Sequence, residues 1–323
     1  MSKSPKRLFI ERDDYMYTPY QAIPTAYHNH LIPYAKYYYQ EDHDGSILDQ
    51  NIKTGDFSIW FHSIRMHHGI QLQPFAQYHV IALHASDDIP VMIADEAMGQ
   101  QKEVSIFNVM PEMHSHITTE DNAESFHINI EPAALPALAR EFPALRPLAA
   151  LPIMEVTRII NKAPFRLNPV SRLITERIRK SKYIGKPAAH FFRRNAADFF
   201  SNYARLLAAP DPIMMNQVQL QLLHEIFQYI VHNLHLQHTH EELHQVFNVD
   251  KAMLERPFEQ EFHITIPELV LQEKMALAFD LLAGTDIPMS GILERIGYSD
   301  LPAFTRTFDK YFRCDPILLR NAQ

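Results

Sequence analysis

Cysteine is nearly absent from this sequence: Cys314 is the only one in 323 residues. An internal disulfide is therefore excluded, and a reducing compartment is expected. The 8 glycines form neither a G-x-G-x-x-G pattern nor a P-loop, so no motif for nucleotide chemistry is visible. No stretch approaches the roughly 20 apolar residues of a membrane span. The N-terminal segment also lacks the apolar run of a signal peptide, so we expect a soluble cytoplasmic protein without membrane contact.

The net charge of −8 is unevenly distributed along the chain. Residues 1–154 carry 10 Lys and Arg against 19 Asp and Glu, residues 155–205 carry 12 against 3, and residues 216–323 carry 8 against 15. Because non-specific DNA affinity comes from neutralised phosphates, the acidic C-terminal region argues against a nucleic-acid role. The basic middle region has three interpretations: a solvated helix face, a partner for the acidic regions, or an auxiliary phosphate contact.

The segment Asp286–Arg320 nevertheless predicts two short amphipathic helices separated by a tight turn. Gly297 can adopt the positive φ that ends a helix and turns the chain sharply. Ser299 and Asp300 can cap the second helix, in which Phe304 and Phe308 lie four residues apart on one side. The pattern is typical of a helix-turn-helix.

These residues resemble the C-terminal helix-turn-helix of the AraC/XylS transcription regulators. The match comprises Ile292, Leu293, Ile296, Gly297, Tyr298, Ser299 and Asp300, then Phe304, Arg306, Phe308 and Lys310, then Asp315, Pro316 and Arg320. A weaker second copy covers His240–Glu261. Between the copies, a helix over Thr265–Ala283 begins with a T-x-x-E capping box. The resemblance implies that this helix holds the two motifs so that they read adjacent major-groove segments.

The predicted fold class is α+β, with three parts. Alternating apolar and polar residues predict strands over Phe57–Ile64, Tyr78–Leu83, Val104–Met110 and Ser125–Glu131. Residues 1–154 are therefore expected to form a β-rich domain, a cupin-like barrel or a sandwich, for effector binding or dimerisation; the cupin likeness comes from the resemblance. Residues 155–212 are predicted as a helical connector and dimer interface. Residues 213–323 are predicted as an all-α domain with two helix-turn-helix motifs.

Candidate DNA-binding residues lie on both predicted recognition helices. They are Lys251, Ala252 and Arg256 upstream, and Ser299, Ala303, Thr305, Arg306, Thr307, Lys310 and Arg313 downstream. Arginine is the usual bidentate reader of guanine, so Arg306 is the best candidate for a specificity residue. The alternative is a surface arginine paired with Asp309 or Asp300. Lys310 and Arg313 are expected to contact phosphates.

Four residues depart from the family pattern. Pro302 replaces the usual serine, Asp309 the usual lysine and Arg313 the usual glycine. Pro257 falls inside the upstream recognition helix, where it removes a backbone hydrogen bond and costs about 3 kcal/mol in a regular interior. We therefore expect the upstream motif to be kinked or to be a poor reader of base sequence.

The β-rich region offers two candidate sites. Ser125, His127, Asn129 and Glu131 alternate with apolar residues, and on a curved strand they could line an effector pocket with Trp60 and His62. The alternative is a solvated strand face. His114, His116 and Glu120 have the H-x-H-x-x-x-E spacing of a cupin metal site, although 19 histidines make chance spacing common.

Three hypotheses follow. The first is a sequence-specific DNA-binding transcription regulator, controlled by a small molecule or by dimerisation through its N-terminal domain. Its expected partners are double-stranded promoter DNA, a small-molecule effector, a second copy of the chain and RNA polymerase, with no cofactor and no catalytic residues. The second is a relative that has lost direct DNA binding and acts through protein contacts. The third is a metal-dependent cupin-type enzyme.

Overall fold

The computed structural model describes residues 6–12, 22–86, 92–93, 96–97, 103–111, 117–119, 122–152 and 154–320. The chain divides into two compact units. The β-rich unit comprises residues 1–167, 171–184 and 195–207, and the helical unit comprises residues 168–170, 185–194 and 208–323. Residues 155–212, predicted as a connector, are thus divided between the two units.

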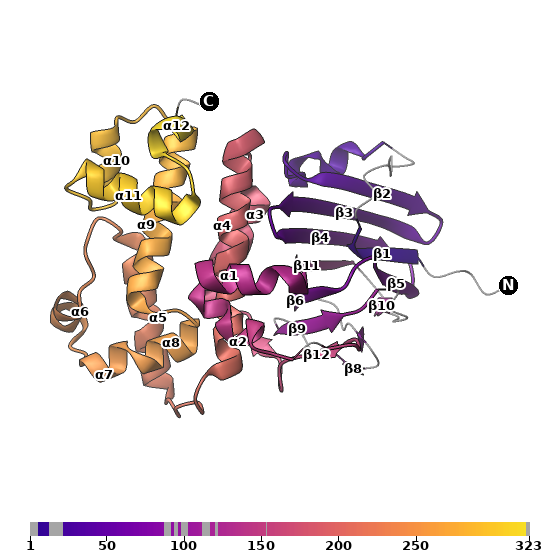
Figure 1. Ribbon diagram of the computed structural model, residues 1–323, viewed down its shortest axis with the longest axis horizontal. Coiled ribbons are helices and arrows are strands. Elements are labelled where there is room, and N and C mark those ends of the chain that lie inside the picture. Colours follow the sequence, from indigo (N-terminus) through magenta and orange to yellow (C-terminus); the bar gives the residue numbers. More distant parts are fainter. Residues whose placement is uncertain are drawn as a thin grey trace. The chain divides into compact units, whose positions relative to one another are not determined.

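The β-rich unit contains a large antiparallel sheet of 8 strands in the order β12-β9-β6-β11-β4-β3-β2, with β13 also paired to β9 (Figure 1). Its strands are β2 (Lys36–Asp42), β3 (Gly45–Thr54), β4 (Phe57–Met66), β6 (Val80–Ser86), β9 (Glu103–Val109), β11 (Ala123–Ile130), β12 (Arg158–Ile159) and β13 (Phe165–Arg166). A second sheet joins β1 (Lys6–Glu11), β5 (Ile70–Ala76) and β10 (Ile117–Thr119), with β1 parallel to β5. β7 (Met92–Ile93) pairs with β8 (Glu96–Ala97).

Apolar side chains from both sheets form a shared core. Leu8 and Ile10 of β1 and Leu72 of β5 pack with Ile64 of β4 and Phe107 of β9. The predicted strands of this region are therefore confirmed. Before residue 50 the sequence left both an irregular arm and loosely paired strands open, because Tyr, His and Pro there obscure the alternation, and the structure has strands.

The other face of the large sheet is also apolar. Phe126 of β11 meets Phe61 of β4, and its ring makes an edge contact with Phe199 at 5.1 Å. The helical elements in and after the sheets are η1 (Thr25–His30), η2 (Pro132–Ala134), α1 (Leu135–Glu141), η3 (Pro143–Leu145), α2 (Arg146–Ala149), α3 (Pro169–Lys180), α4 (Gly185–Ala204) and η4 (Arg205–Ala208). The first ten residues of α4 belong to the helical unit and the rest to the β-rich unit.

The helical unit continues with helices α5 to α12. In Figure 1, α9 runs between α7 and α8 on one side and α10 and α11 on the other. The helices are α5 (Gln217–His232), α6 (His240–Phe247), α7 (Lys251–Leu254), α8 (Arg256–Phe262), α9 (Ile266–Gly284), α10 (Met289–Arg295), α11 (Leu301–Phe312) and α12 (Pro316–Arg320). The rings of Phe304, Phe308 and Phe312 on α11 pack toward Phe279 of α9, whose ring lies 4.7 Å from that of Phe312. This arrangement confirms the predicted α+β class. Among the described residues, no helix is long and apolar enough to cross a membrane.

Candidate nucleic-acid interface

The turn between α10 and α11 is built around Gly297, whose φ is 67°. A Cβ atom there would lie 2.2 Å from the backbone oxygen of His235, so only glycine fits. Gln237 Nε2 donates to the Gly297 oxygen at 2.9 Å, and the backbone N–H of Tyr298 donates to the Leu293 oxygen at 2.9 Å. The loop after α5 thus packs against the turn that sets the direction of α11. The sequence alone did not indicate this contact.

The outer face of α11 carries Arg306 and Lys310. Asp300 caps the helix by accepting from the Ala303 N–H at 2.9 Å, as predicted. Arg306 and Lys310 are exposed, and none of the described residues hydrogen-bonds to or forms an ion pair with either. The alternative pairing of Arg306 with Asp309 or Asp300 is therefore not found within the described chain. Both cations are available to an outside partner.

The other downstream candidates surround this face. Ser299 and Arg313 are exposed, whereas Ala303, Thr305 and Thr307 are half-buried. The hydroxyl of Thr307 donates to the Ala303 oxygen at 2.9 Å, so its donor is already used. Arg313 adopts a φ of 58° and ends α11, with its N–H donating to the Asp309 oxygen. Glycine is the usual residue at such a left-handed position, which explains why the family pattern has glycine where this chain has Arg313.

The upstream motif is interrupted after one helical turn. Asn248, with a φ of 52°, makes the turn after α6, and Asp250 caps α7 by accepting from the Met253 N–H at 2.8 Å. The helix then ends at Glu255, and α8 begins with buried Pro257 in its first turn. The expected kink is confirmed as a complete break. Lys251, Ala252 and Arg256 are exposed, but the Lys251 Nζ lies 3.4 Å from Glu255, and Arg256 donates to the Asp211 oxygen at 2.8 Å.

Helix α9 connects the two motifs. Its predicted capping box is confirmed, since Thr265 and Glu268 exchange side-chain-to-backbone hydrogen bonds. Its 19 residues give a rod of roughly 28 Å at about 1.5 Å per residue. Lys274 near its middle is buried, and its Nζ lies 5.8 Å from the Tyr298 ring centroid. Burial lowers the pKa of Lys274, although Glu242 opposes the shift.

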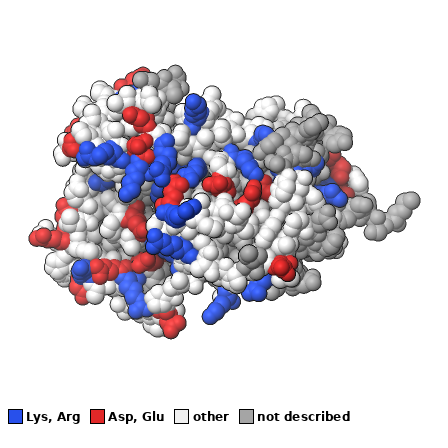
Figure 2. Space-filling model, viewed as in Figure 1, with Lys and Arg blue, Asp and Glu red and all other residues white. Residues whose placement is uncertain are grey.

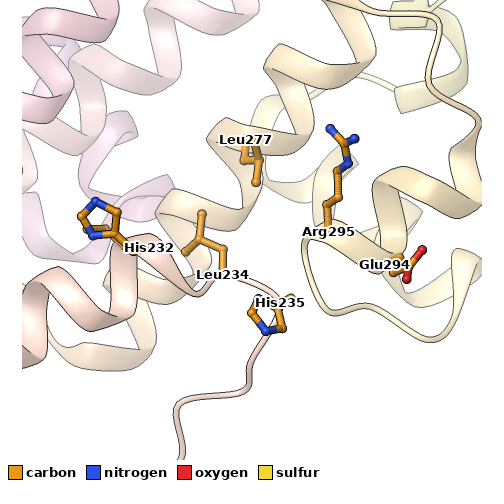
Figure 3. A pocket seen from close by; sticks show the side chains of 7 residues that line it. His232, Leu234, His235, Leu277, Glu294 and Arg295 are labelled. Atoms are coloured by element: carbon orange, nitrogen blue, oxygen red, sulfur yellow. The ribbon is translucent and has the colours of Figure 1, made fainter.

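A cavity of about 640 Å³ lies beside α9, between the end of α5 and α10 (Figure 3). It is lined by Val231, His232, Leu234, His235, Leu277, Glu294 and Arg295. The elements that meet there are the end of α5, the loop that follows it, α9 and α10. No predicted residue lines it, because its members are scattered in sequence and share no motif.

The exposed charges are mixed. Figure 2 shows Lys and Arg interspersed with Asp and Glu over the displayed face, without one continuous basic surface. On the basic helix α3, Lys180 pairs with Glu176 at 2.8 Å, and Arg179 pairs with Glu124 of β11. Arg179 and Lys180 of the middle region therefore have acidic partners within the β-rich unit, which weakens the interpretation of these two as auxiliary phosphate contacts.

The predicted effector residues lie inside the β-rich unit. Ser125, His127 and Asn129 are 4%, 2% and 1% exposed, so the alternative of a solvated face is wrong for these three, whereas Glu131 is exposed. The His62 and His127 rings stack 5.0 Å apart. His62 Nδ1 lies 2.6 Å from Asp49 Oδ1, and both side chains are buried. Sequence alternation located the face but missed Asp49.

Trp60 has little freedom to meet a ligand. Its ring is fully buried beside His62, His127 and Tyr38, and its N–H donates to the Ser58 hydroxyl at 2.9 Å. By contrast, Asp49 Oδ2, His62 Nε2 and Ser125 Oγ are buried and accept or donate no hydrogen bond within the described chain. Burial raises the pKa of Asp49, which His62 opposes, and it lowers the pKa of His127 well below its usual range.

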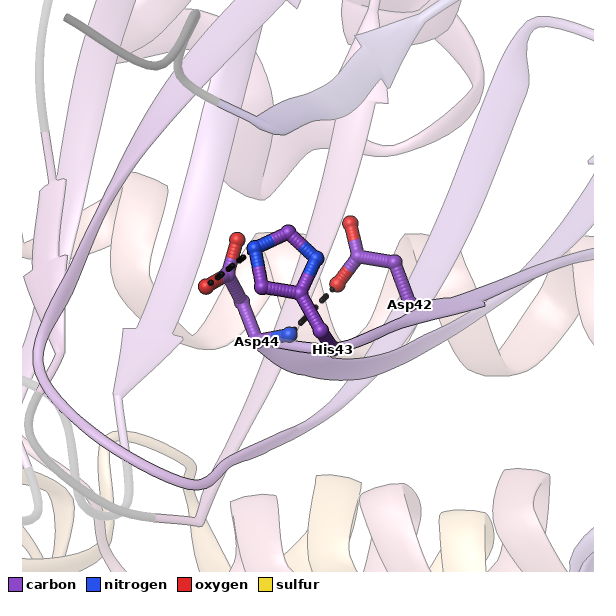
Figure 4. A group of neighbouring side chains, drawn as sticks. All are labelled: Asp42, His43 and Asp44. Atoms are coloured by element: carbon purple, nitrogen blue, oxygen red, sulfur yellow. Dashed lines mark hydrogen bonds and ion pairs between the residues drawn. The ribbon is translucent and has the colours of Figure 1, made fainter. Parts of the chain in front are cut away.

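The predicted metal site stays a prediction. His114, His116 and Glu120 lie outside the described residues. Among the described residues, Asp42, His43 and Asp44 in the turn between β2 and β3 bring three ligand-type atoms within 4.8 Å (Figure 4). However, Asp42 Oδ1 accepts from the Asp44 N–H and pairs with Lys6 at 2.7 Å, and Asp44 pairs with His43 and His68. These carboxylates therefore stabilise the turn.

Comparison with known proteins gives one family match: residues 243–322 match a helix-turn-helix domain family. No curated protein matches the chain. Among solved structures, the C-terminal domain of AraT, a response regulator from Geobacillus stearothermophilus, is 28% identical, with 32% of this chain and 85% of that one covered and a TM-score of 0.30. The DNA-binding domain of AdpA, in complex with a target DNA, is 20% identical, with 31% of this chain and 90% of that one covered and a TM-score of 0.29. ToxT from Vibrio cholerae is 9% identical, with 82% of this chain and 97% of that one covered and a TM-score of 0.32.

These TM-scores are all below 0.5, so the assignment depends on the family match and on the residues that form the two motifs. The matched segment contains both motifs, the connecting helix and the glycine turn. The chain therefore carries, over residues 243–322, a helix-turn-helix domain, and its downstream motif contains the residues that resemble those of the AraC/XylS regulators.

Proposed function

We propose that this protein is a sequence-specific DNA-binding transcription regulator whose activity is controlled through its N-terminal domain. The observation that carries this proposal is the outer face of α11, where Arg306 and Lys310 are exposed and have no partner among the described residues. A capped helix with exposed cations in its first three turns fits the major groove, with Arg306 at base edges and Lys310 at phosphates. Promoter DNA is the partner, and a homodimer that contacts RNA polymerase is the proposed assembly.

The test is binding of the full chain to its own upstream DNA, measured by fluorescence anisotropy at several salt concentrations. Each phosphate contact contributes about 0.9 to the slope of log affinity against log salt. Lys310→Ala should lower that slope, whereas Lys186→Ala, an exposed cation on α4, should leave it unchanged. A flat salt response of the wild type would instead favour a relative that acts through protein contacts, as the acidic composition of residues 216–323 suggests.

We further propose that the β-rich unit senses a small molecule at its polar interior. The support is the set of buried atoms without hydrogen-bond partners in the described chain, Asp49 Oδ2, His62 Nε2 and Ser125 Oγ. Such atoms each cost about 1–3 kcal/mol unless a water or a ligand satisfies them. A compound screen by thermal denaturation tests this proposal: an effector should raise the melting temperature of the wild type but not of His62→Ala. A compound that stabilises both equally would place the effector elsewhere.

A further inference from the structure

The two recognition elements differ in length. Helix α11 continues for 12 residues, whereas α7 has four. Recognition helices in known complexes place base-contacting side chains over about two turns. Helix α11 exposes Pro302, Arg306, Asp309 and Lys310 over that length. Helix α7 is too short to do the same.

The chain after α7 does not replace the missing turns. Glu255 has φ −91° and ψ −93°, outside the helical region, so α8 takes a new direction. The side chains of α8 are used inside the helical unit. Phe258 is buried against Phe262, the side chain of Gln260 bonds the backbone of Ile213, and Glu261 accepts from His224 Nε2 at 2.8 Å. Little of α8 remains for a base edge.

The cations of the two motifs also differ. Lys251 is paired with Glu255, and the Arg256 guanidinium donates to the Asp211 oxygen. These exposed contacts are weak, so a phosphate can displace them, but they hold both side chains near the protein surface. Arg306 has no such contact within the described chain and can present its planar donors to a guanine.

We propose that the chain reads base sequence through α11 alone, with Arg306 as the specificity-determining residue, and that the upstream motif supplies only phosphate contacts. This inference rests on the proposed DNA binding. Each chain should then have one specific major-groove segment, and the neighbouring segment about one helical turn away should tolerate any sequence.

The experiment uses a duplex selected by the full wild-type chain from a randomised pool, together with a scrambled duplex. The specificity ratio is the dissociation constant for the scrambled duplex divided by that for the selected duplex. It is measured for the wild type, Arg306→Ala, Arg306→Lys and Lys251→Ala. Both Arg306 variants should lower the ratio about tenfold, because the bidentate contact is lost. Arg306→Lys keeps the charge, so its affinity for the scrambled duplex should equal that of the wild type, which also shows that it is folded. Lys251→Ala should weaken binding to both duplexes equally and lower the slope of log affinity against log salt by about 0.9.

An unchanged ratio in both Arg306 variants, or an equal loss of ratio in Lys251→Ala, would overturn the inference while leaving DNA binding intact. The inference would also be overturned if the selected duplex contained a second segment whose sequence preference is lost in Ala252→Glu but kept in Arg306→Lys. A wild-type chain that binds both duplexes equally would instead overturn the proposed function itself.

Discussion

Between its two sheets the β-rich unit buries Asp49, His62, His127 and Asn129, whereas around Phe279 the helical unit buries phenylalanine rings. In the first interior, neighbouring strands are coupled by hydrogen bonds, such as His62 to Asp49 and Asn129 to the Ile10 oxygen. In the second, helices are coupled by ring contacts of 4.7–6.2 Å. Polar interiors depend on complete pairing and on protonation, while apolar interiors depend on volume. The β-rich unit should therefore be destabilised by the loss of a hydrogen-bond partner or by protonation, and the helical unit by the loss of side-chain volume.

The largest effect is expected from Phe279→Ala. This ring contacts Phe191, Phe308 and Phe312, so its loss leaves a cavity at the junction of α9 with α11. Truncation of a buried phenylalanine costs about 4 kcal/mol. Hydrogen-exchange mass spectrometry should show lost protection in peptides of α9 and α11, with peptides of β4 unchanged. Val246→Ala, at a 52% exposed position, is the control and should be nearly neutral. Equal loss in both units would contradict separate cores.

A smaller effect, about 3 kcal/mol, is expected from Asp49→Ala. It removes the acceptor of His62 Nδ1 in a fully buried setting and leaves that group without a partner. The protein's only tryptophan, Trp60, stacks on His62, so tryptophan fluorescence reports unfolding of this interior in urea.

The double variant Asp49→Leu/His62→Leu sharpens the comparison. Replacing both members of a buried pair by apolar residues is often neutral, so the double variant should be more stable than Asp49→Ala. If it is less stable than the single variant, the interior is held by packing of the histidine ring rather than by the hydrogen bond.

The same contrast explains what the sequence could predict. Periodicity found α9 and α11, and capping residues placed the starts of both, because Thr265 and Asp300 act within one turn of the chain. The break after α7 was indicated by Pro257 alone, since proline excludes a continuous helix locally. These features depend on neighbours in sequence.

Long-range partners could not be predicted. Asp49 meets His62 across β3 and β4, and the loop at His235 excludes any side chain at Gly297. The cavity beside α9 likewise combines residues from four separate elements. Alternation placed Ser125 and His127 on one face, but only the position of β1, whose Ile10 oxygen accepts from His127 and Asn129, shows that this face is inside.

The smallest effect is expected from pH. Burial lowers the pKa of His84 to about 3 and that of His127 well below its usual value. Because the folded form resists protonation while the unfolded chain protonates near pH 6.5, the stabilisation is complete above about pH 6.5 and is lost as the pH falls. At pH 5 His84 alone should lower the unfolding free energy by about 2 kcal/mol. Urea unfolding followed by tryptophan fluorescence should therefore shift to lower urea between pH 7 and pH 5, and His84→Gln should reduce that shift. Hydrogen exchange in α11 should change less over the same range, because the Phe308 ring contacts Phe279, Phe304 and Phe312, none of which titrates. An equal change in α11 would assign the acid sensitivity to the whole chain rather than to the histidine interior.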